Sequence, residues 1–285
     1  DNKVSVLAAD NNAPSTSLIN TIILGDSASI SGLYLVADDA SDKRLAMLAN
    51  DYQYQWRPDE VVPWYWTNGT TTLSLYDVEQ PESASEITTV NIEGYLVDSR
   101  RIGNLLYLIT RSTPTLEAFI PYPATSEDRA SNQQAINNAD INDLLPQYID
   151  GAGATNNLVS AQNCLVPNAE SSSLRSPSIV TISAINLQDA SDINSVCLAE
   201  SVFATYVSLD SMYLVSNQYP ISRQIDFFAG FEIIDIHKFT FTDLGPVYAG
   251  SGRLNGGFSS GNPAYRMGEH NGRLAVITSE TFNSG

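Results

Sequence analysis

The sequence predicts an all-β fold, a β-propeller of four-stranded antiparallel blades with one inserted segment that carries a short helix. The first observation behind this prediction is a unit of strand, turn and strand that occurs four times. It is clearest in Tyr95–Arg101, the turn Gly103-Asn104 and the apolar run Leu105–Ile109. Gly and Asn adopt the backbone angles of tight turns at low cost, and an apolar run of strand length suits a strand covered on both faces.

The second observation is the spacing of these units. Their second strands begin at Leu45, Leu105, Met212 and Arg273, which lie 60, 107 and 61 residues apart. One period of about 60 residues explains all three distances if the middle one contains an insertion. Repeats of a small antiparallel sheet indicate a propeller, whose blades usually have about 40–50 residues, so these blades are expected to be enlarged by loops.

Each element can be placed in order along residues 1–285, which we interpret as a single β-propeller domain, itself part of a larger ring. Val4–Ala8 and Leu18–Leu24 are expected to be the outer strands of a blade that lacks its beginning. The first complete blade should contain the following segments: the hairpin Leu33–Ala49, the strand Thr70–Val78 and the outer strand Glu86–Ile92.

The insertion is expected to cover residues 114–177, within the blade that begins at Tyr95. Its one helical patch is predicted at Ser131–Ile149, where Asp140 can cap a short helix. The β-pattern then continues through these segments: Ser178–Leu187, Ser195–Leu198, Val202–Val207, Met212–Ser216, Phe231–Thr242, Pro246–Ser251 and the hairpin Ala264–Thr278.

About four blades are visible in this way, and the first and last are incomplete. Exposed strand edges recruit pairing from other chains. We therefore expect the chain either to pair with another chain or to be completed by a missing C-terminal half. The hydrogen-bonding partners of Leu274–Thr278 test this expectation, with closure by the N-terminal strands as the alternative.

Composition limits the function. The formal net charge is −18 and the isoelectric point is near 4.2, which disfavours nucleic acid and anionic lipid as partners because both need a basic surface. No apolar run approaches the length of a membrane span. Only 16% of residues are charged, and Ser, Thr, Asn and Gly take their place, as in many exported β-proteins. This composition favours a secreted, cell-surface or periplasmic location.

The sequence has two cysteines, Cys164 and Cys197. Two cysteines without a nearby histidine cannot build a zinc site. A pair in an acidic chain of this kind is expected to form one disulfide, with two free buried thiols as the alternative.

Catalytic motifs are weak. Gly257–Gly261 fits the Gly-x-Ser-x-Gly pattern, but it lies in a loop between antiparallel strands, whereas a nucleophile elbow needs a strand-to-helix turn. The only histidines, His237 and His270, are far apart in the sequence. Asp140–Asp143 and Asp38–Asp42 contain acidic spacings found in calcium loops but lack the glycine and the glutamate of that motif. A helix cap and a turn are the alternative interpretations, so we expect no cofactor and leave Ca²⁺ open.

An aromatic segment, residues 52–68, is the most suggestive candidate for binding. It contains all three tryptophans of the chain, and its candidate binding residues are Trp56, Trp64, Tyr65 and Trp66. Trp and Tyr are enriched at interfaces because they combine contact area with a polar edge, and they also stack on sugars. The alternative is that these rings only cover the edge of the propeller itself.

Several of these patterns resemble a known family, the secreted bacterial and archaeal proteins with a β-propeller domain distantly related to WD repeats. The resemblance rests on these segments: Glu93–Gly103 followed by Leu106–Thr110, Asp143–Tyr148 with the region around Cys164, Ile236–Phe239, and Gly250–Gly252 with Tyr265–Leu274, which is most like proteobacterial members. It implies a propeller and an exported location, and it supplies no catalytic residues. Members of the family continue beyond the end of this sequence.

Three functions therefore compete. The first is a non-catalytic extracellular or cell-surface interaction module with a protein or glycan partner. The second is a structural subunit of an extracellular assembly. The third is a propeller enzyme, such as a quinone-dependent dehydrogenase or a hydrolase, which would need several carboxylates and His237 in a polar central pocket.

Overall fold

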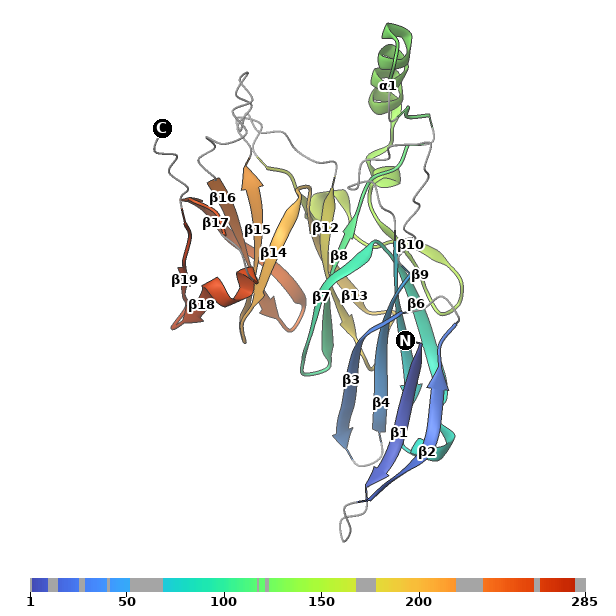
Figure 1. Ribbon diagram of the computed structural model, residues 1–285. Helices are drawn as coiled ribbons and strands as arrows, with labels where there is room; N and C mark the ends of the chain where they lie inside the picture. Colours follow the sequence, from blue (N-terminus) through green and yellow to red (C-terminus); the bar gives the residue numbers. More distant parts are fainter. Residues whose placement is uncertain are drawn as a thin grey trace.

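The computed structural model describes residues 2–9, 15–25, 29–39, 42–51, 69–116, 118–120, 123–167, 178–218, 233–258 and 262–279. These residues form three complete four-stranded blades with a two-stranded hairpin at each end of the row (Figure 1). The fold class predicted from the sequence is confirmed.

The strands of each blade follow one another outward from an inner strand. Blade 1 contains β3 (Ser29–Asp39), β4 (Asp42–Asp51), β5 (Thr70–Asp77) and β6 (Ser85–Glu93). Blade 2 contains β7 (Tyr95–Ile102), β8 (Leu105–Ser112), β12 (Ile179–Asn186) and β13 (Ile193–Leu198). Blade 3 contains β14 (Val202–Val207), β15 (Ser211–Gln218), β16 (Ile233–Thr242) and β17 (Gly245–Asn255). The end hairpins are β1 (Lys3–Ala9) with β2 (Thr16–Ile23), and β18 (Met267–His270) with β19 (Arg273–Val276).

The core lies between the blades, and this explains the continuous apolar runs. Successive side chains of a strand point to opposite faces. In β8, Leu106 and Leu108 pack towards blade 1, while Tyr107 and Ile109 pack towards blade 3. All four are at most 1% exposed. Full burial of such a side chain contributes about 1.5–3 kcal/mol, so every blade is stabilised through both faces.

The inserted segment is built into the neighbouring sheets. Its strands β9 (Gln147–Ile149) and β10 (Thr155–Asn157) extend blade 1 beyond β6, and β11 (Cys164–Leu165) pairs in parallel with β13. Blade 1 thus becomes a six-stranded sheet and blade 2 a five-stranded sheet. The insertion ties the two blades together at their outer edges.

The helix prediction was wrong in its boundaries. Helix α1 spans Ser126–Asn138, earlier in the chain than the predicted patch Ser131–Ile149, and Gln147–Ile149 is a strand. Thr125 begins the helix with a capping box, in which its side chain accepts from the N–H of Asp128 and the Asp128 side chain accepts in return. Asp140 caps only a 3₁₀ turn, η2 (Ile141–Leu144).

Cys164 and Cys197 form the predicted disulfide, which joins β11 to β13 directly opposite one another. The free-thiol alternative is therefore excluded. Cys197 is 1% exposed and packs with Leu145, Val159 and Ile179 in a small cluster beneath the insertion. The bond fastens the end of the insertion to the outer edge of blade 2.

The row of blades is open at both ends within the described residues. There β1 pairs only with β2, and β19 pairs only with β18, as expected for a partial ring. The two end hairpins lie at opposite ends of the row in Figure 1. The first strand of the last predicted hairpin begins at Met267 and not at Ala264, because the 3₁₀ turn η4 (Pro263–Arg266) occupies its first part.

Candidate functional site

The connections between strands distinguish the two ends of the blades. Second and third strands are joined through residues 52–69, 113–178 and 219–232, whereas first and second strands are joined through 40–41, 103–104 and 208–210. Neighbouring strands in each blade are antiparallel, so all three long connections emerge at the end where the inner strands begin. Helix α1 marks this end of blade 2 in Figure 1. We call it the long-connection end.

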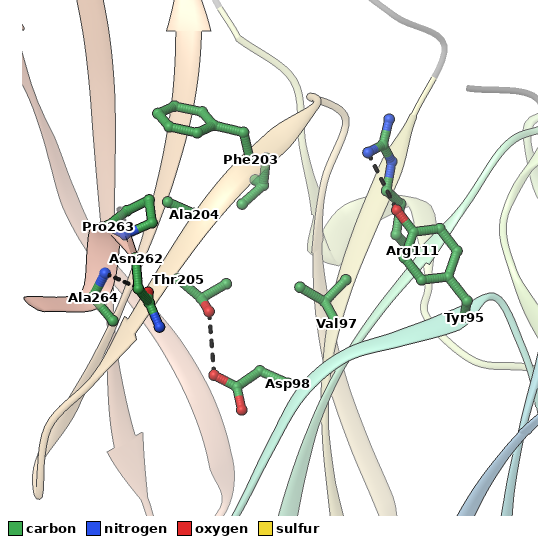
Figure 2. A pocket seen from close by; sticks show the side chains of 11 residues that line it. Tyr95, Val97, Asp98, Arg111, Phe203, Ala204, Thr205, Asn262, Pro263 and Ala264 are labelled. Carbon is green, nitrogen blue, oxygen red and sulfur yellow. Dashed lines mark hydrogen bonds between the residues drawn. The ribbon is translucent and has the colours of Figure 1, made fainter. Parts of the chain in front are cut away.

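A cavity of about 430 Å³ opens at the long-connection end, between the inner strands β7 and β14 and the turn η4 (Figure 2). Its described lining comes from blades 2 and 3 and the segment before β18: Tyr95, Val97, Asp98, Arg111, Val202, Phe203, Ala204, Thr205, Asn262, Pro263 and Ala264. Its size is in the range of sites for small ligands or for a few residues of a peptide.

Two β-bulges shape the cavity. The register between β7 and β8 shifts between Leu96 and Asp98, which leaves Val97 as the extra residue. The same shift occurs in β14 between Val202 and Ala204, with Phe203 as the extra residue. A bulge changes the face on which the following side chains lie. Leu96 therefore packs towards blade 1, while Asp98 reaches blade 3.

Arg111 supplies the positive charge of the cavity. It lies near the end of β8, opposite Tyr95, and is partly buried. Its Nε donates to Ser178 Oγ at 2.6 Å, Nη1 to Tyr95 Oη at 3.3 Å and Nη2 to Ser201 Oγ at 3.1 Å. All three acceptors are neutral hydroxyls. Figure 2 shows the guanidinium beside the Tyr95 ring at one side of the cavity.

Asp98 supplies the negative charge. Its Oδ2 accepts from Thr205 Oγ1 at 3.2 Å, which links blade 2 to blade 3, and its Oδ1 accepts from the N–H of Ser99 at 2.8 Å. On the opposite wall, Asn262 Oδ1 accepts from the N–H of Ala264 at 3.0 Å and so holds the start of η4. The Asp98 carboxylate and the Arg111 guanidinium lie on different parts of the lining (Figure 2).

The apolar part of the lining is accessible. Val97 is 38% exposed and Phe203 is 42% exposed, although both belong to inner strands. The Phe203 ring contacts the Phe258 ring, with their centroids 5.9 Å apart. Pro263 and Ala264 continue the apolar surface across η4. The cavity thus combines one cation, one anion and an open apolar wall.

The candidate binding residues Trp56, Trp64, Tyr65 and Trp66 lie outside the described residues. The end of their connection can nevertheless be placed. Gly69 O accepts from the N–H of Gly94 at 2.7 Å, and a Cβ on Gly69 would lie 3.1 Å from Tyr95 Cβ. Gly69, the residue after the aromatic segment, therefore lies beside Tyr95, one of the residues that line the cavity.

The histidines take different places. His237 is buried in β16, with Nε2 3.0 Å from Glu200 Oε2 and Nδ1 3.4 Å from Tyr248 Oη. His270 ends β18 and is exposed. Neither belongs to the described lining of the cavity, which has Asp98 as its one carboxylate. The described lining of this cavity therefore lacks the several carboxylates and the His237 side chain that the enzyme hypothesis required.

The structure describes only part of the two segments that were compared with calcium-binding loops, Asp140–Asp143 and Asp38–Asp42. Asp140 Oδ1 accepts from the N–H of Asn142 at 2.9 Å, which is the predicted capping role. Residues 40 and 41 of the second segment lie outside the described residues. Among the residues that the structure describes, no group of three His, Cys, Asp or Glu side chains is placed to hold a metal.

A second cavity, of about 330 Å³, lies between the outer part of blade 1 and the turn from β12 to β13. Asp150 and Asp189 lie in its lining, and hydrogen bonds lower the pKa of both carboxyls. For Asp150 the main donor is the backbone of Ala154, and for Asp189 it is the Ser191 hydroxyl. These carboxylates order their own turns.

The model of the Beta propeller domain family matches residues 1–285. The chain belongs to this family. The match spans every blade and both end hairpins of this propeller. No curated protein matches the chain. Within the described part of this propeller, none of the helices has the length and apolar character that a membrane crossing requires.

Sequence reasoning did not find Arg111 or Asp98. One signal was present, because Arg111 lies two positions after the apolar run Leu105–Ile109 in a chain with 14 Lys and Arg residues and 32 Asp and Glu residues. A cation at the end of a buried strand needs a partner or a role. The bulge that turns Asp98 towards blade 3 has no comparable signal in the sequence.

Proposed function

We propose that this propeller is a non-catalytic interaction module outside the cytoplasm and that it binds a protein partner with its long-connection end. The observation that carries the proposal is the placement of the three long connections and the cavity at the same end of the blades. Binding residues are concentrated on loops that a rigid scaffold positions. The end of β4 and the start of β5, which the aromatic segment with Trp64 and Trp66 connects, both lie at this end.

Two further features support a location outside the cytoplasm. The disulfide between Cys164 and Cys197 is of a kind that persists in oxidising compartments. The net charge of −18 keeps the surface away from nucleic acid and anionic lipid. The proposal therefore gives the module a protein partner, with a glycan as the other possible outcome of the test.

The experiment compares capture by three immobilised forms of the chain from the extracellular and periplasmic fractions of its source organism. The forms are the wild type, a Trp64→Ala/Trp66→Ala variant and a Leu209→Ser/Leu244→Ser variant. Leu209 and Leu244 lie in tight turns at the opposite end and are 76% and 83% exposed, so they are the matched control.

We expect a protein that the wild type and the Leu variant retain and the Trp variant loses. Glycan arrays probed with the same three forms provide the comparison. Capture that depends on the leucines would place the partner at the opposite end and refute the proposal. Glycan binding that depends on the tryptophans, without any protein, would replace the protein partner by a glycan.

A second candidate, a subunit of an assembly, rests on the outer edges of β1 and β19. Each strand has one pairing partner among the described residues. Ile277 N–H donates inward to Arg266 O, so the alternating N–H groups of Leu274 and Val276 point outward. Pairing there would protect these two amides from hydrogen exchange and raise the mass in light scattering with concentration. A constant monomer mass with rapid exchange would exclude pairing between copies.

A further inference from the structure

We propose that the cavity between blades 2 and 3 binds a carboxylate group next to an apolar side chain, with Arg111 as the carboxylate ligand. This inference rests on the proposed function and names the chemistry of the partner segment that enters the cavity. A chain terminus of the form apolar residue plus free carboxylate has this chemistry, and so does an Asp or Glu side chain beside an apolar residue.

The first argument is the bonding of Arg111. A guanidinium carries five N–H groups and remains charged at every relevant pH. The three hydrogen bonds of Arg111 go to hydroxyls of Ser178, Tyr95 and Ser201, which leaves two N–H groups. No carboxylate of the described residues forms an ion pair with it. Hydroxyl groups thus hold the Arg111 guanidinium in place. The described residues do not supply a carboxylate, which is the strongest type of acceptor for a guanidinium.

The hydroxyl partners also restrict the orientation of the guanidinium. They come from three segments, the start of β7, the residue before β12 and the residue before β14. A planar group held at Nε, Nη1 and Nη2 has little rotational freedom left to lose when a ligand binds. Such preorganisation reduces the entropic cost of binding.

The second argument is a further positive charge on the same side of blade 2. Arg100 in β7 lies opposite Tyr107 in β8, and paired residues share a face, so both side chains are on the side of blade 3. Arg100 Nε is buried and makes no hydrogen bond. Asp98, two residues earlier in the chain, lines the cavity, and its oxygens already accept from Thr205 and Ser99. Arg100 therefore adds a second positive charge to the face of blade 2 on which Asp98 reaches blade 3.

The third argument is the apolar wall. Val97 and Phe203 project from their bulges as partly exposed side chains, and Pro263 and Ala264 of η4 add apolar atoms to the lining. A purely ionic ligand such as a free phosphate would gain nothing from this surface. A Leu-sized side chain beside a carboxylate would cover it, and covering apolar surface stabilises a complex.

The test uses the 285-residue chain with isotope-labelled methyl groups and follows Val97, Ala204 and Ala264 by NMR. The probes are N-acetyl-leucine, N-acetyl-leucinamide and N-acetyl-glutamic acid α-amide. We expect saturable shifts of these methyls with N-acetyl-leucine and at least tenfold weaker binding of the leucinamide. If the glutamate probe binds as tightly as N-acetyl-leucine, the cavity accepts a side-chain carboxylate as well as a terminal one. If the glutamate probe does not bind, the cavity selects the carboxylate of a chain terminus.

The substitutions test the role of the guanidinium. Arg111→Gln should weaken N-acetyl-leucine binding at least tenfold, and Arg111→Lys should weaken it less because it keeps the charge but loses the planar fork. Arg129→Gln is the matched control, since it removes the same charge from exposed positions of α1. It should leave binding unchanged.

A second pair of variants guards against loss of folding. Ala264 lies in η4, outside the blades, so Ala264→Asp leaves the sheets intact and places a negative charge opposite Arg111. It should weaken the carboxylate probe more than Ala264→Asn does. Equal effects of the two variants, or equal binding of N-acetyl-leucine and its amide, would overturn the proposal, and so would the absence of methyl shifts with either carboxylate.

The test of the carboxylate site and the test of the proposed function can fail independently of each other. Protein capture that depends on Trp64 and Trp66 but not on Arg111 would leave the proposed function standing and contradict the carboxylate site. Methyl shifts that require Arg111, in the absence of any captured protein, would support the site and contradict the proposed partner.

Discussion

Replacement of Gly94 by alanine should destabilise the propeller and disturb the cavity together. Gly94 joins the outer strand of blade 1 to the inner strand of blade 2 and has φ of 106°, which L residues rarely adopt. A Cβ there would lie 2.8 Å from the carbonyl oxygen of Arg111 and 3.0 Å from its carbonyl carbon. These are backbone atoms of a paired strand, so they cannot move aside as the end of a flexible side chain can.

Two costs determine the magnitude. A sparsely populated backbone conformation costs about 1–3 kcal/mol. Forcing an extra carbon into a packed site costs about 1–3 kcal/mol more. The sum of about 2–6 kcal/mol is large beside the 5–15 kcal/mol that stabilises a typical domain, and it corresponds to a fall of roughly 5–20 °C in Tm.

Two other glycines separate these costs. Gly103 has φ of 57°, and a Cβ added there would meet no heavy atom within 4 Å, so Gly103→Ala should lose only about 1 kcal/mol. Gly252 has neither a positive φ nor a close neighbour, so Gly252→Ala should stay within about 0.5 kcal/mol of the wild type.

Urea and thermal unfolding of the three variants, followed by circular dichroism, measure these differences. The reasoning about Gly94 is wrong if Gly94→Ala is no less stable than Gly103→Ala, because the contact with the Arg111 backbone would then cost nothing. A folded Gly94→Ala variant should also bind N-acetyl-leucine more weakly than Gly252→Ala, since the strain falls on the strand that carries Arg111.

Three further predictions concern the disulfide and two carboxyl groups. A Cys164→Ser/Cys197→Ser variant, which opens a loop with a sequence separation of 33, should lose about 3–4 kcal/mol in urea unfolding and become insensitive to reductant; a reductant-sensitive stability in this variant would contradict the assignment. Burial raises the pKa of Glu93, so its contribution to stability is present below its unfolded value of about 4.3 and is lost as the pH rises through the folded value. Glu93→Gln should therefore be more stable than the wild type at pH 7 and equal to it near pH 4, and an advantage independent of pH would argue against burial as the cause. Burial raises the pKa of Glu269, but hydrogen bonds, including that from Lys238 Nζ at 2.9 Å, outweigh it and lower the pKa overall, so its stabilising effect is present above about pH 4.3 and is lost as the pH falls through the folded value. The hydrogen-exchange protection factors of β18 and β19, which correct for the intrinsic exchange rate at each pH, should fall in the wild type at low pH and in Glu269→Gln at pH 7. Unchanged protection factors in the variant would show that apolar packing alone holds this hairpin.

The sequence by itself was sufficient to predict the strands and hairpins of the blades. Runs such as Leu105–Ile109 are apolar without alternation because both faces of each blade are covered, and the turn Gly103-Asn104 marks the register of its hairpin. These signals are local, since they depend on residues within one or two strands. The pairing of Cys164 with Cys197 could also be predicted, because the chain has only two cysteines.

Only the tertiary structure decided the site and the course of the insertion. Arg111 obtains its orientation from Ser178 and Ser201, which lie 67 and 90 residues away, and no local pattern encodes such partners. The bulge at Val97 decides whether Asp98 faces blade 1 or blade 3, and it depends on how β7 pairs with β8. The boundaries of α1 were missed because the helix is mostly exposed and is begun by the side chains of its capping box, so no apolar periodicity reveals it. The cavity at the long-connection end depends on contacts between distant segments, whereas the blades depend on patterns that a short stretch of chain already contains.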